Sequence, residues 1–324
     1  MNEPPKTKTI NHIRNAMLGL VVGDALGVPA EFISREYLKT RPITDMIGFG
    51  SHNQKPGTWS DDSSLALCLA DELSQGFNLQ KIGDSFVAWL YEKRWTPHGF
   101  VFDIGLTTRE AIRRLKEGTT AHLAGNTDED SNGNGSLMRI MPLLFYIRQN
   151  SKTIDKFEVI KDVSGITHRH IRSVLACNYY LEFANAICEG ENAKDAYQLA
   201  NTAFLNVTSV LNINPAEVAH FNRLLSGNMA KLKETEIYST GYVMHTLETS
   251  VWCILTTDNF EQAVLKAVNL GEDTDTTGAV TGGLAGLLYG TEQIPAYWLG
   301  QIARLEDIED LIQKMIAKYK DANV

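Results

Sequence analysis

Two acidic segments, far apart in the sequence, carry the residues best suited to bind a cation. The first, GTWSDDSS, contains Ser60, Asp61 and Asp62 and precedes a stretch with helical periodicity. Ser60 is well placed to cap a helix, and acidic residues in a first helical turn complement the helix dipole without any ligand. For this segment alone, helix capping is the simpler interpretation.

The second segment, GEDTDTTG at residues 271–278, places three carboxylates and several hydroxyl groups together. In apolar surroundings such carboxylates would repel one another, and their pKa values would rise unless a cation neutralised them. Asp273 and Asp275 match the first positions of a calcium-binding EF-hand loop, but Leu284 stands where that loop needs a glutamate. Oxygen ligands without a nearby Cys or His favour a hard cation such as Mg²⁺, Mn²⁺ or Ca²⁺ over Zn²⁺.

A glycine-rich turn, NGNGSLMR at residues 132–139, has backbone N–H groups that could bind a diphosphate. It lacks the third glycine of a dinucleotide-binding fingerprint and the lysine of a phosphate-binding loop, so a plain turn is the alternative. The histidines of THRH, His168 and His170, are open to two interpretations as well. They either contact phosphate or make structural hydrogen bonds.

The elements that position these residues are predicted to be helices, because apolar residues recur mostly at helical spacing and strand-like alternation is scarce. Apolar stripes run through residues 65–73 and 174–181. Further helices are expected, to within several residues, near Ile10–Leu26, Leu79–Tyr91, Thr107–Lys116, Ala193–Asn201, Pro215–Leu225, Gly241–Leu255, Phe260–Leu270, Thr277–Tyr289 and Ile308–Tyr319.

Two of these helices are rich in glycine. The one near Thr277–Tyr289 contains four glycines, although each costs a helix roughly 1 kcal/mol relative to alanine. Close packing would offset this cost, because missing side chains let two helix backbones approach each other. The same argument applies to Gly19, Gly23 and Gly27. We therefore expect both helices to be central and buried.

The composition predicts one compact domain over residues 1–324, acting as a monomer in the cytoplasm. Hydrophobic residues make up 44% of the chain, and no linker or internal repeat divides it. The net charge is −9 and the basic residues are scattered, so neither nucleic acid nor a membrane surface is an expected partner. No signal peptide or transmembrane segment is expected. Four cysteines are expected to be reduced core residues: Cys68, Cys177, Cys188 and Cys253.

Taken in order, several motifs resemble the ADP-ribosylglycohydrolase family. They are GDALGVPAE from residue 23, TWSDDSS, FDIG from residue 102, NGNGSLMR, Thr167-His168 and GEDTDTTGAVTGGLAGLLYG. The set spans most of the chain, and its most specific part is the last acidic segment with the small-residue helix that follows. The TTGAVTGGLAG sequence there is closer to the dinitrogenase-reductase-activating branch than to the branch that acts on ADP-ribosylserine.

The resemblance implies an orthogonal all-α fold and two divalent cations, Mg²⁺ or Mn²⁺. The implied metal ligands are Ser60, Asp61, Asp62, Asp273, Asp275 and Thr276. Many relatives have threonine in place of Ser60, but serine keeps the hydroxyl group. The implied catalytic residues are Glu31, which acts on the ribose or its attacking water, Asp103, which matches an aspartate implicated in arginine-linked hydrolysis, and the ligands Asp62 and Asp275.

The same resemblance implies where the substrate would bind. The ADP-ribose diphosphate and adenosine would be lined by Gly133, Asn134, Gly135, Ser136 and His168. For Arg139, pairing with phosphate and a structural ion pair are equally supported. Loops 34–56 and 119–131 lack periodicity and flank the site motifs, so we expect them to select the substrate.

The implied activity is hydrolytic removal of ADP-ribose from a modified protein side chain, with arginine favoured over serine. Cleavage builds positive charge on the ribose, and bound cations would orient its hydroxyl groups and activate water. A leaving guanidine must be protonated, since its pKa exceeds about 12, so Asp103 or Glu31 would assist. The alternatives are a hydrolase of serine-linked, other O-linked or free ADP-ribose conjugates, a metal-dependent glycosyltransferase, and a non-catalytic relative.

Overall fold

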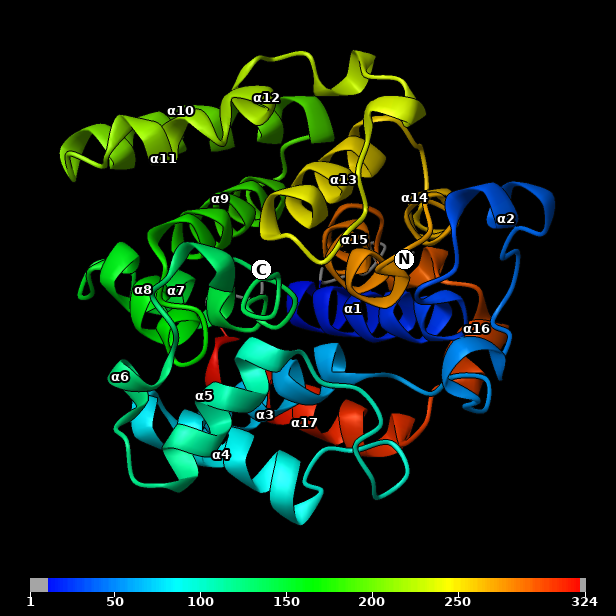
Figure 1. The fold of residues 1–324 in the computed structure, drawn as a ribbon, viewed down its shortest axis with the longest axis horizontal. Coiled ribbons are helices and arrows are strands. Elements are labelled where there is room, and N and C mark those ends of the chain that lie inside the picture. Colours follow the sequence, from blue (N-terminus) through cyan, green and yellow to red (C-terminus); the bar gives the residue numbers. More distant parts are fainter. Residues whose placement is uncertain (1–10, 321–324) are drawn as a thin grey trace, which may run out of the picture.

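The computed structural model describes residues 11–320, whose regular secondary structure is almost entirely helical (Figure 1). Within this range the only extended pairings are three isolated bridges. The predicted all-α fold is confirmed. The helices are α1 (His12–Gly27), α2 (Arg35–Thr40), α3 (Asp61–Gln75), α4 (Leu79–Glu92), α5 (Leu106–Lys116), α6 (Ala121–Ala124), α7 (Leu143–Asn150), α8 (Lys156–Gly165), α9 (Ile171–Cys188), α10 (Ala193–Val210), α11 (Pro215–Ala219), α12 (Asn222–Leu225), α13 (Val243–Leu255), α14 (Phe260–Val268), α15 (Thr274–Tyr289), α16 (Ala296–Gln301) and α17 (Leu305–Lys318).

Most long helices lie where the periodicity predicts them, with three notable differences. The first helix was expected to start at Ile10, which lies outside the described residues. The N-terminal residues, in which no signal peptide was expected, lie outside them as well. The helix expected at Pro215–Leu225 is divided into α11 and α12, and at the break Phe221 packs on Phe204 with ring centroids 4.5 Å apart. Helix α15 begins at Thr274, so part of the second acidic segment forms its first turn.

Helices α1 and α15 lie against each other at the centre of the molecule, and the other helices surround them (Figure 1). Gly19 of α1 faces Gly282 of α15, and Gly23 faces Gly278. A Cβ atom on any of these glycines would collide with the carbonyl oxygen of its partner. The predicted glycine-mediated packing of two buried helices is thus present, and it brings the C-terminal end of α1 to the N-terminal end of α15.

The described residues bury their hydrophobic side chains in one continuous cluster around this pair. All four cysteines are free and buried, as predicted for reduced core residues. Among residues 11–320 no helix is both long and apolar enough to span a lipid bilayer.

Replacing Gly19 by alanine is expected to lower the free energy of unfolding by about 3 kcal/mol, because the methyl group would meet the backbone of α15. Urea unfolding measures this effect. The matched control is Gly300→Ala in α16, where an added Cβ meets nothing within 4 Å. The free energy of unfolding of the control variant is expected to rise by about 0.5–1 kcal/mol, because alanine has a higher helix propensity than glycine. Equal losses in both variants would contradict the close approach of the two helices.

Candidate active site

Asp24, near the end of α1, fixes the start of α3 against the central helix pair. Its fully buried carboxylate accepts hydrogen bonds from the backbone N–H groups of Ser60 at 2.9 Å and Ser63 at 3.0 Å. These amides belong to the helix start, where backbone donors lack partners within the helix. Sequence reasoning did not select Asp24 as a site residue, although it quoted the segment GDALG that contains it.

The two acidic segments meet at this point. Asp24, Asp62 and Asp275 each offer a carboxylate oxygen, and these atoms lie within 4.8 Å of one another. All three side chains are almost completely buried, and Oδ1 of Asp62 and Oδ2 of Asp275 have no hydrogen-bond partner. Buried carboxylate oxygens without partners are costly, so this arrangement fits a bound cation.

Burial and mutual repulsion raise the pKa values of these carboxyl groups. Burial is the main cause for Asp62 and Asp275, whose pKa values lie well above the usual range, and neighbouring carboxylates add to it. The pKa of Asp61 is raised in the same way, with Asp103 as the next cause after burial. Burial also raises the pKa of Asp24 to about 6, against the hydrogen bonds from Ser63 and Ser60. A cation would relieve this repulsion.

A second carboxylate group adjoins the first. Glu31, Asp273 and Asp275 offer oxygens that lie within 4.8 Å of one another. Asp273 is the residue before α15, and its Oδ2 accepts a hydrogen bond of 2.7 Å from the side chain of Asn134. Asn134 also donates to Thr246 Oγ1 at 2.9 Å. The glycine-rich segment is thereby attached to the acidic one.

The hydroxyl residues of the predicted ligand set lie beside these carboxylates. Ser60 precedes α3, and its Oγ donates to Asp62 Oδ2 at 2.7 Å. Thr276 is buried in the first turn of α15, and its backbone N–H donates to Asp275 Oδ1 at 3.0 Å. The structure therefore brings all six predicted ligands to the ends of two helices that meet at Asp24.

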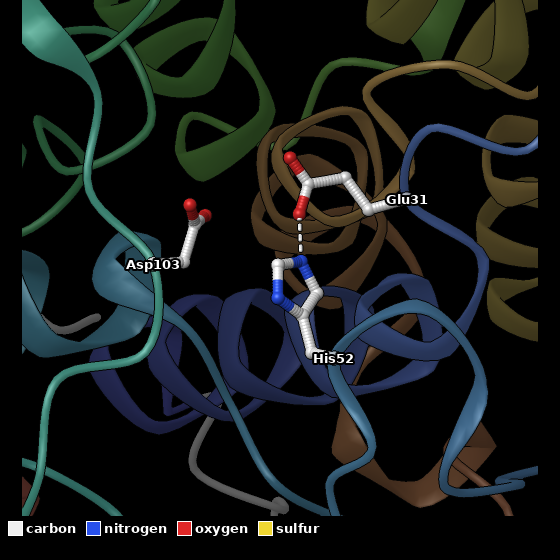
Figure 2. Close-up of side chains that lie close together, drawn as sticks. All are labelled: Glu31, His52 and Asp103. Atoms are coloured by element: carbon white, nitrogen blue, oxygen red, sulfur yellow. Dashed lines mark hydrogen bonds and ion pairs between the residues drawn. The ribbon is translucent and has the colours of Figure 1, made fainter.

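Glu31, His52 and Asp103 form a third group, drawn in Figure 2. A hydrogen bond joins His52 Nε2 to the Glu31 carboxylate. Burial raises the pKa of Glu31 to about 7, and the bond to Glu31 raises the pKa of His52. Sequence reasoning missed His52, because no periodic pattern marks residues 34–56. The segment was expected to be a loop, but it contains helix α2 and a 3-10 turn that ends at His52.

A cleft of about 540 Å³ opens over these groups. Its lining includes most of the predicted site residues, namely Glu31, Asp61, Asp103, Gly133, Asn134, Gly135, His168, Asp273 and Thr276. The cleft is therefore formed where the acidic segments, the FDIG segment and the glycine-rich turn converge.

The glycine-rich turn lies directly on His168. A Cβ atom on Gly135 would come within 2.8 Å of the His168 ring. Burial, with a contribution from the charge of Arg139, lowers the pKa of His168 to about 3, so its imidazole is neutral. Ser136 differs from its neighbours, because its hydroxyl accepts a hydrogen bond of 2.9 Å from Ser164 in the interior and does not line the cleft.

Arg139 and His170 have structural contacts. Arg139 is fully buried beneath the turn, where it donates to the carbonyl oxygens of Gly135 and Val163 and lies 5.0 Å from the Phe86 ring. It neither lines the cleft nor pairs with a carboxylate of the described chain, so neither predicted role is observed. His170 caps α9 by accepting from the backbone of Arg172.

The fold and the cleft define a helical enzyme with a carboxylate-rich site. The model of the ADP-ribosylglycohydrolase family matches residues 5–323, and the chain belongs to that family. Its activity is accordingly that of an ADP-ribosylglycohydrolase, and its acidic clusters suit the metal dependence of the family. The predicted family is confirmed, and the helical fold excludes an α/β glycosyltransferase.

Three comparisons illustrate the relationship. The ADP-ribosylarginine hydrolase Tri1 of Serratia proteamaculans (strain 568) is 33% identical over 314 residues, which cover 96% of this chain and 80% of that protein. The ADP-ribosyl-[dinitrogen reductase] glycohydrolase of Rhodospirillum rubrum is 30% identical, with 89% and 88% covered. A solved structure titled as an ADP-ribosylglycohydrolase-related protein complex matches with a TM-score of 0.78 and 29% identity, covering 95% of this chain and 98% of its own.

Adding Mg²⁺ or Mn²⁺ to the EDTA-treated protein is expected to raise its unfolding temperature, because only the folded chain gathers the carboxylates. At a hundredfold excess over the Kd, the gain is about 2.7 kcal/mol. Asp62→Asn is expected to lose most of this gain while making the metal-free protein more stable, since one repelling carboxylate is gone. Thermal unfolding followed by circular dichroism measures both effects.

The control for this measurement is Asp310→Asn, which changes an exposed carboxylate on α17. It is expected to keep the full cation-dependent gain. If neither Mg²⁺ nor Mn²⁺ changes the unfolding temperature of the wild-type protein, a cation site in the cluster is ruled out.

Proposed function

We propose that this enzyme hydrolyses the N-glycosidic bond between ADP-ribose and an arginine side chain of a modified protein. The observation that carries the proposal is that the carboxylates of Asp62, Asp275 and Glu31 belong to two adjoining clusters. Glu31 and Asp103 of this region line the cleft, and Asp103 lies beside His52. The names of the relatives from Serratia and Rhodospirillum support it, since the first is an ADP-ribosylarginine hydrolase and the second acts on ADP-ribosyl-dinitrogen reductase.

We further propose that two divalent cations, Mg²⁺ or Mn²⁺, are held by the two acidic segments. Their ligands would be Ser60, Asp61, Asp62, Asp273, Asp275 and Thr276, with Asp24 and Glu31 as close neighbours. Bound cations supply two kinds of chemistry here, orientation of the ribose hydroxyl groups and a lowered pKa of bound water. The unpartnered oxygens of Asp62 and Asp275 support this assignment.

The glycine-rich turn would bind the diphosphate and adenosine of the substrate. Gly133 and Gly135 have no side chains, so their backbone N–H groups can approach phosphate oxygens closely. Asn134 holds this turn against Asp273, and the neutral imidazole of His168 lies below it. Since the Ser136 hydroxyl is turned inward, that residue would contribute through its backbone alone.

Two carboxyl groups would handle the protons of the reaction. Glu31 is held in place by His52 and lies within reach of Asp273 and Asp275, so it is suited to accept a proton from the attacking water. Asp103 offers a carboxylate oxygen within 4.8 Å of the ligand atoms of Glu31 and His52, and it lines the cleft (Figure 2). It is suited to protonate the guanidine nitrogen that leaves the ribose, because that nitrogen departs more easily when it receives a proton as the C–N bond breaks.

The protein is also proposed to act as a single-domain monomer. Its buried hydrophobic residues form one continuous cluster, which supports the single domain.

Purified protein with Mg²⁺ or Mn²⁺ is expected to release ADP-ribose from arginine-modified peptides faster than from serine-modified peptides, and EDTA is expected to stop the reaction. Asp61→Asn and Asp275→Asn are expected to lower kcat/KM about 10³-fold, because each removes several kcal/mol of cation-dependent stabilisation. Chromatographic quantification of free ADP-ribose measures the rates. Release from serine-modified peptides alone would overturn the linkage, and no release from any conjugate would favour a non-catalytic relative.

Replacing Asp103 by asparagine is expected to lower kcat for the arginine linkage by roughly 10²–10⁴-fold, because general acid catalysis is lost. KM is expected to rise by less than kcat falls, since the ADP-ribose contacts remain. Steady-state kinetics at saturating cation measure both constants, and Asp310→Asn serves again as the control. An Asp103→Asn enzyme with unchanged kcat would assign the proton to another group.

A further inference from the structure

A row of four aromatic rings runs from the cleft, which Phe32 lines, to an adjoining small pocket that Phe100 and Phe102 line together with Asp103. The ring centroids of Phe32 and His52 are 6.0 Å apart, those of His52 and Phe102 are 5.2 Å apart, and those of Phe102 and Phe100 are 6.4 Å apart. These rings come from three separate loops, so the fold assembles them and no single sequence motif predicts the row.

Phe32 is held at the end of this row at an energetic cost. Its φ angle is 64°, in the left-handed region that a bulky side chain rarely adopts, and its side chain is 74% exposed. The backbone N–H of Phe32 donates to the carbonyl oxygen of Glu272 at 2.6 Å, which ties this conformation to the second acidic segment. A strained backbone that presents a large apolar ring to solvent beside an active site indicates a binding role.

The aromatic rings lie next to the two proposed proton-transfer residues, Glu31 and Asp103. Glu31 precedes Phe32 in sequence, Asp103 follows Phe102, and His52 lies between them with ligand atoms of all three within 4.8 Å of one another. Figure 2 shows both carboxylates on the same side of the His52 ring. Both carboxylates line the cleft, but Glu31 is hydrogen-bonded to His52, so Asp103 is the one without a bond to that ring.

We propose that the row Phe32–His52–Phe102–Phe100 is the leaving-group subsite, and that it binds the arginine side chain by stacking its guanidinium on the rings beside Asp103. A guanidinium is planar and cationic, so it stacks on aromatic faces and pairs with a carboxylate through two parallel hydrogen bonds. A serine hydroxyl does neither. The subsite rests on the proposed arginine linkage and would account for the preference over serine.

Calorimetric titration with L-argininamide and with L-lysinamide tests the subsite without any turnover. Wild-type protein is expected to bind argininamide more tightly, because a lysine ammonium cannot stack. Phe32→Ala is expected to weaken argininamide binding about fivefold, and Phe32→Tyr is expected to restore it. Phe100→Ala provides a second variant at the other exposed end of the row, with its ring 44% exposed. Tyr297→Ala is the matched control, because Tyr297 is 57% exposed on α16 and lines neither the cleft nor the small pocket of Phe100 and Phe102.

The outcomes separate this inference from the proposed function. Unchanged argininamide affinity in both phenylalanine variants would overturn the subsite even if the wild-type protein hydrolyses arginine conjugates. Weaker binding of free ADP-ribose instead of argininamide in Phe32→Ala would also overturn it, by assigning the row to the nucleotide. Failure of the wild-type protein to cleave arginine conjugates would overturn the proposed function, whatever the titrations show.

Discussion

Direct contact between the backbones of α1 and α15 is the constraint on which the site depends. The two helices run antiparallel, with Gly19 against Gly282 and Gly23 against Gly278, so no side chain separates them. Asp24 on α1 and Asp275 on α15 are one residue and three residues away from the last of these contacts. A wider helix spacing would therefore separate carboxylates that come from opposite ends of the sequence.

Gathering so many carboxylates lowers the stability of the metal-free protein, and the fold offsets part of that cost locally. Helices α3 and α15 both begin at the site, and the positive ends of their dipoles favour nearby negative charge. Asp24 uses the free amides of Ser60 and Ser63 in the same way. One carboxylate oxygen of Asp62 and one of Asp275 still have no hydrogen-bond partner, so the cost of burying these two oxygens is not offset by hydrogen bonds.

The sequence predicts the parts of this site that have a local pattern. Gly19 and Gly23 recur at helical spacing, and Asp61 and Asp62 follow the capping residue Ser60 in the first turn of a helix, so each feature is visible within a single segment. His52 is different, since its role comes only from its contact with Glu31 across a loop. The contacts among the rings of Phe32, His52, Phe102 and Phe100 could not be predicted either, and nor could the inward orientation of the Ser136 hydroxyl. Both depend on how distant segments of the chain pack. Helices α7 and α8 were not predicted either, although Phe157, Ile160 and Val163 of α8 recur at helical spacing.

The position of Arg139 has a consequence for how the cleft attracts its ligand. Its guanidinium is enclosed by the Gly135 and Val163 carbonyls and the Phe86 ring, with no counter-ion among the described residues. Water screens such an enclosed charge poorly, so its field extends through the protein beyond the glycine-rich turn. An anion on the far side of that turn would experience a permanent attraction from a cation that it never touches, and ionic strength would weaken that attraction only slightly.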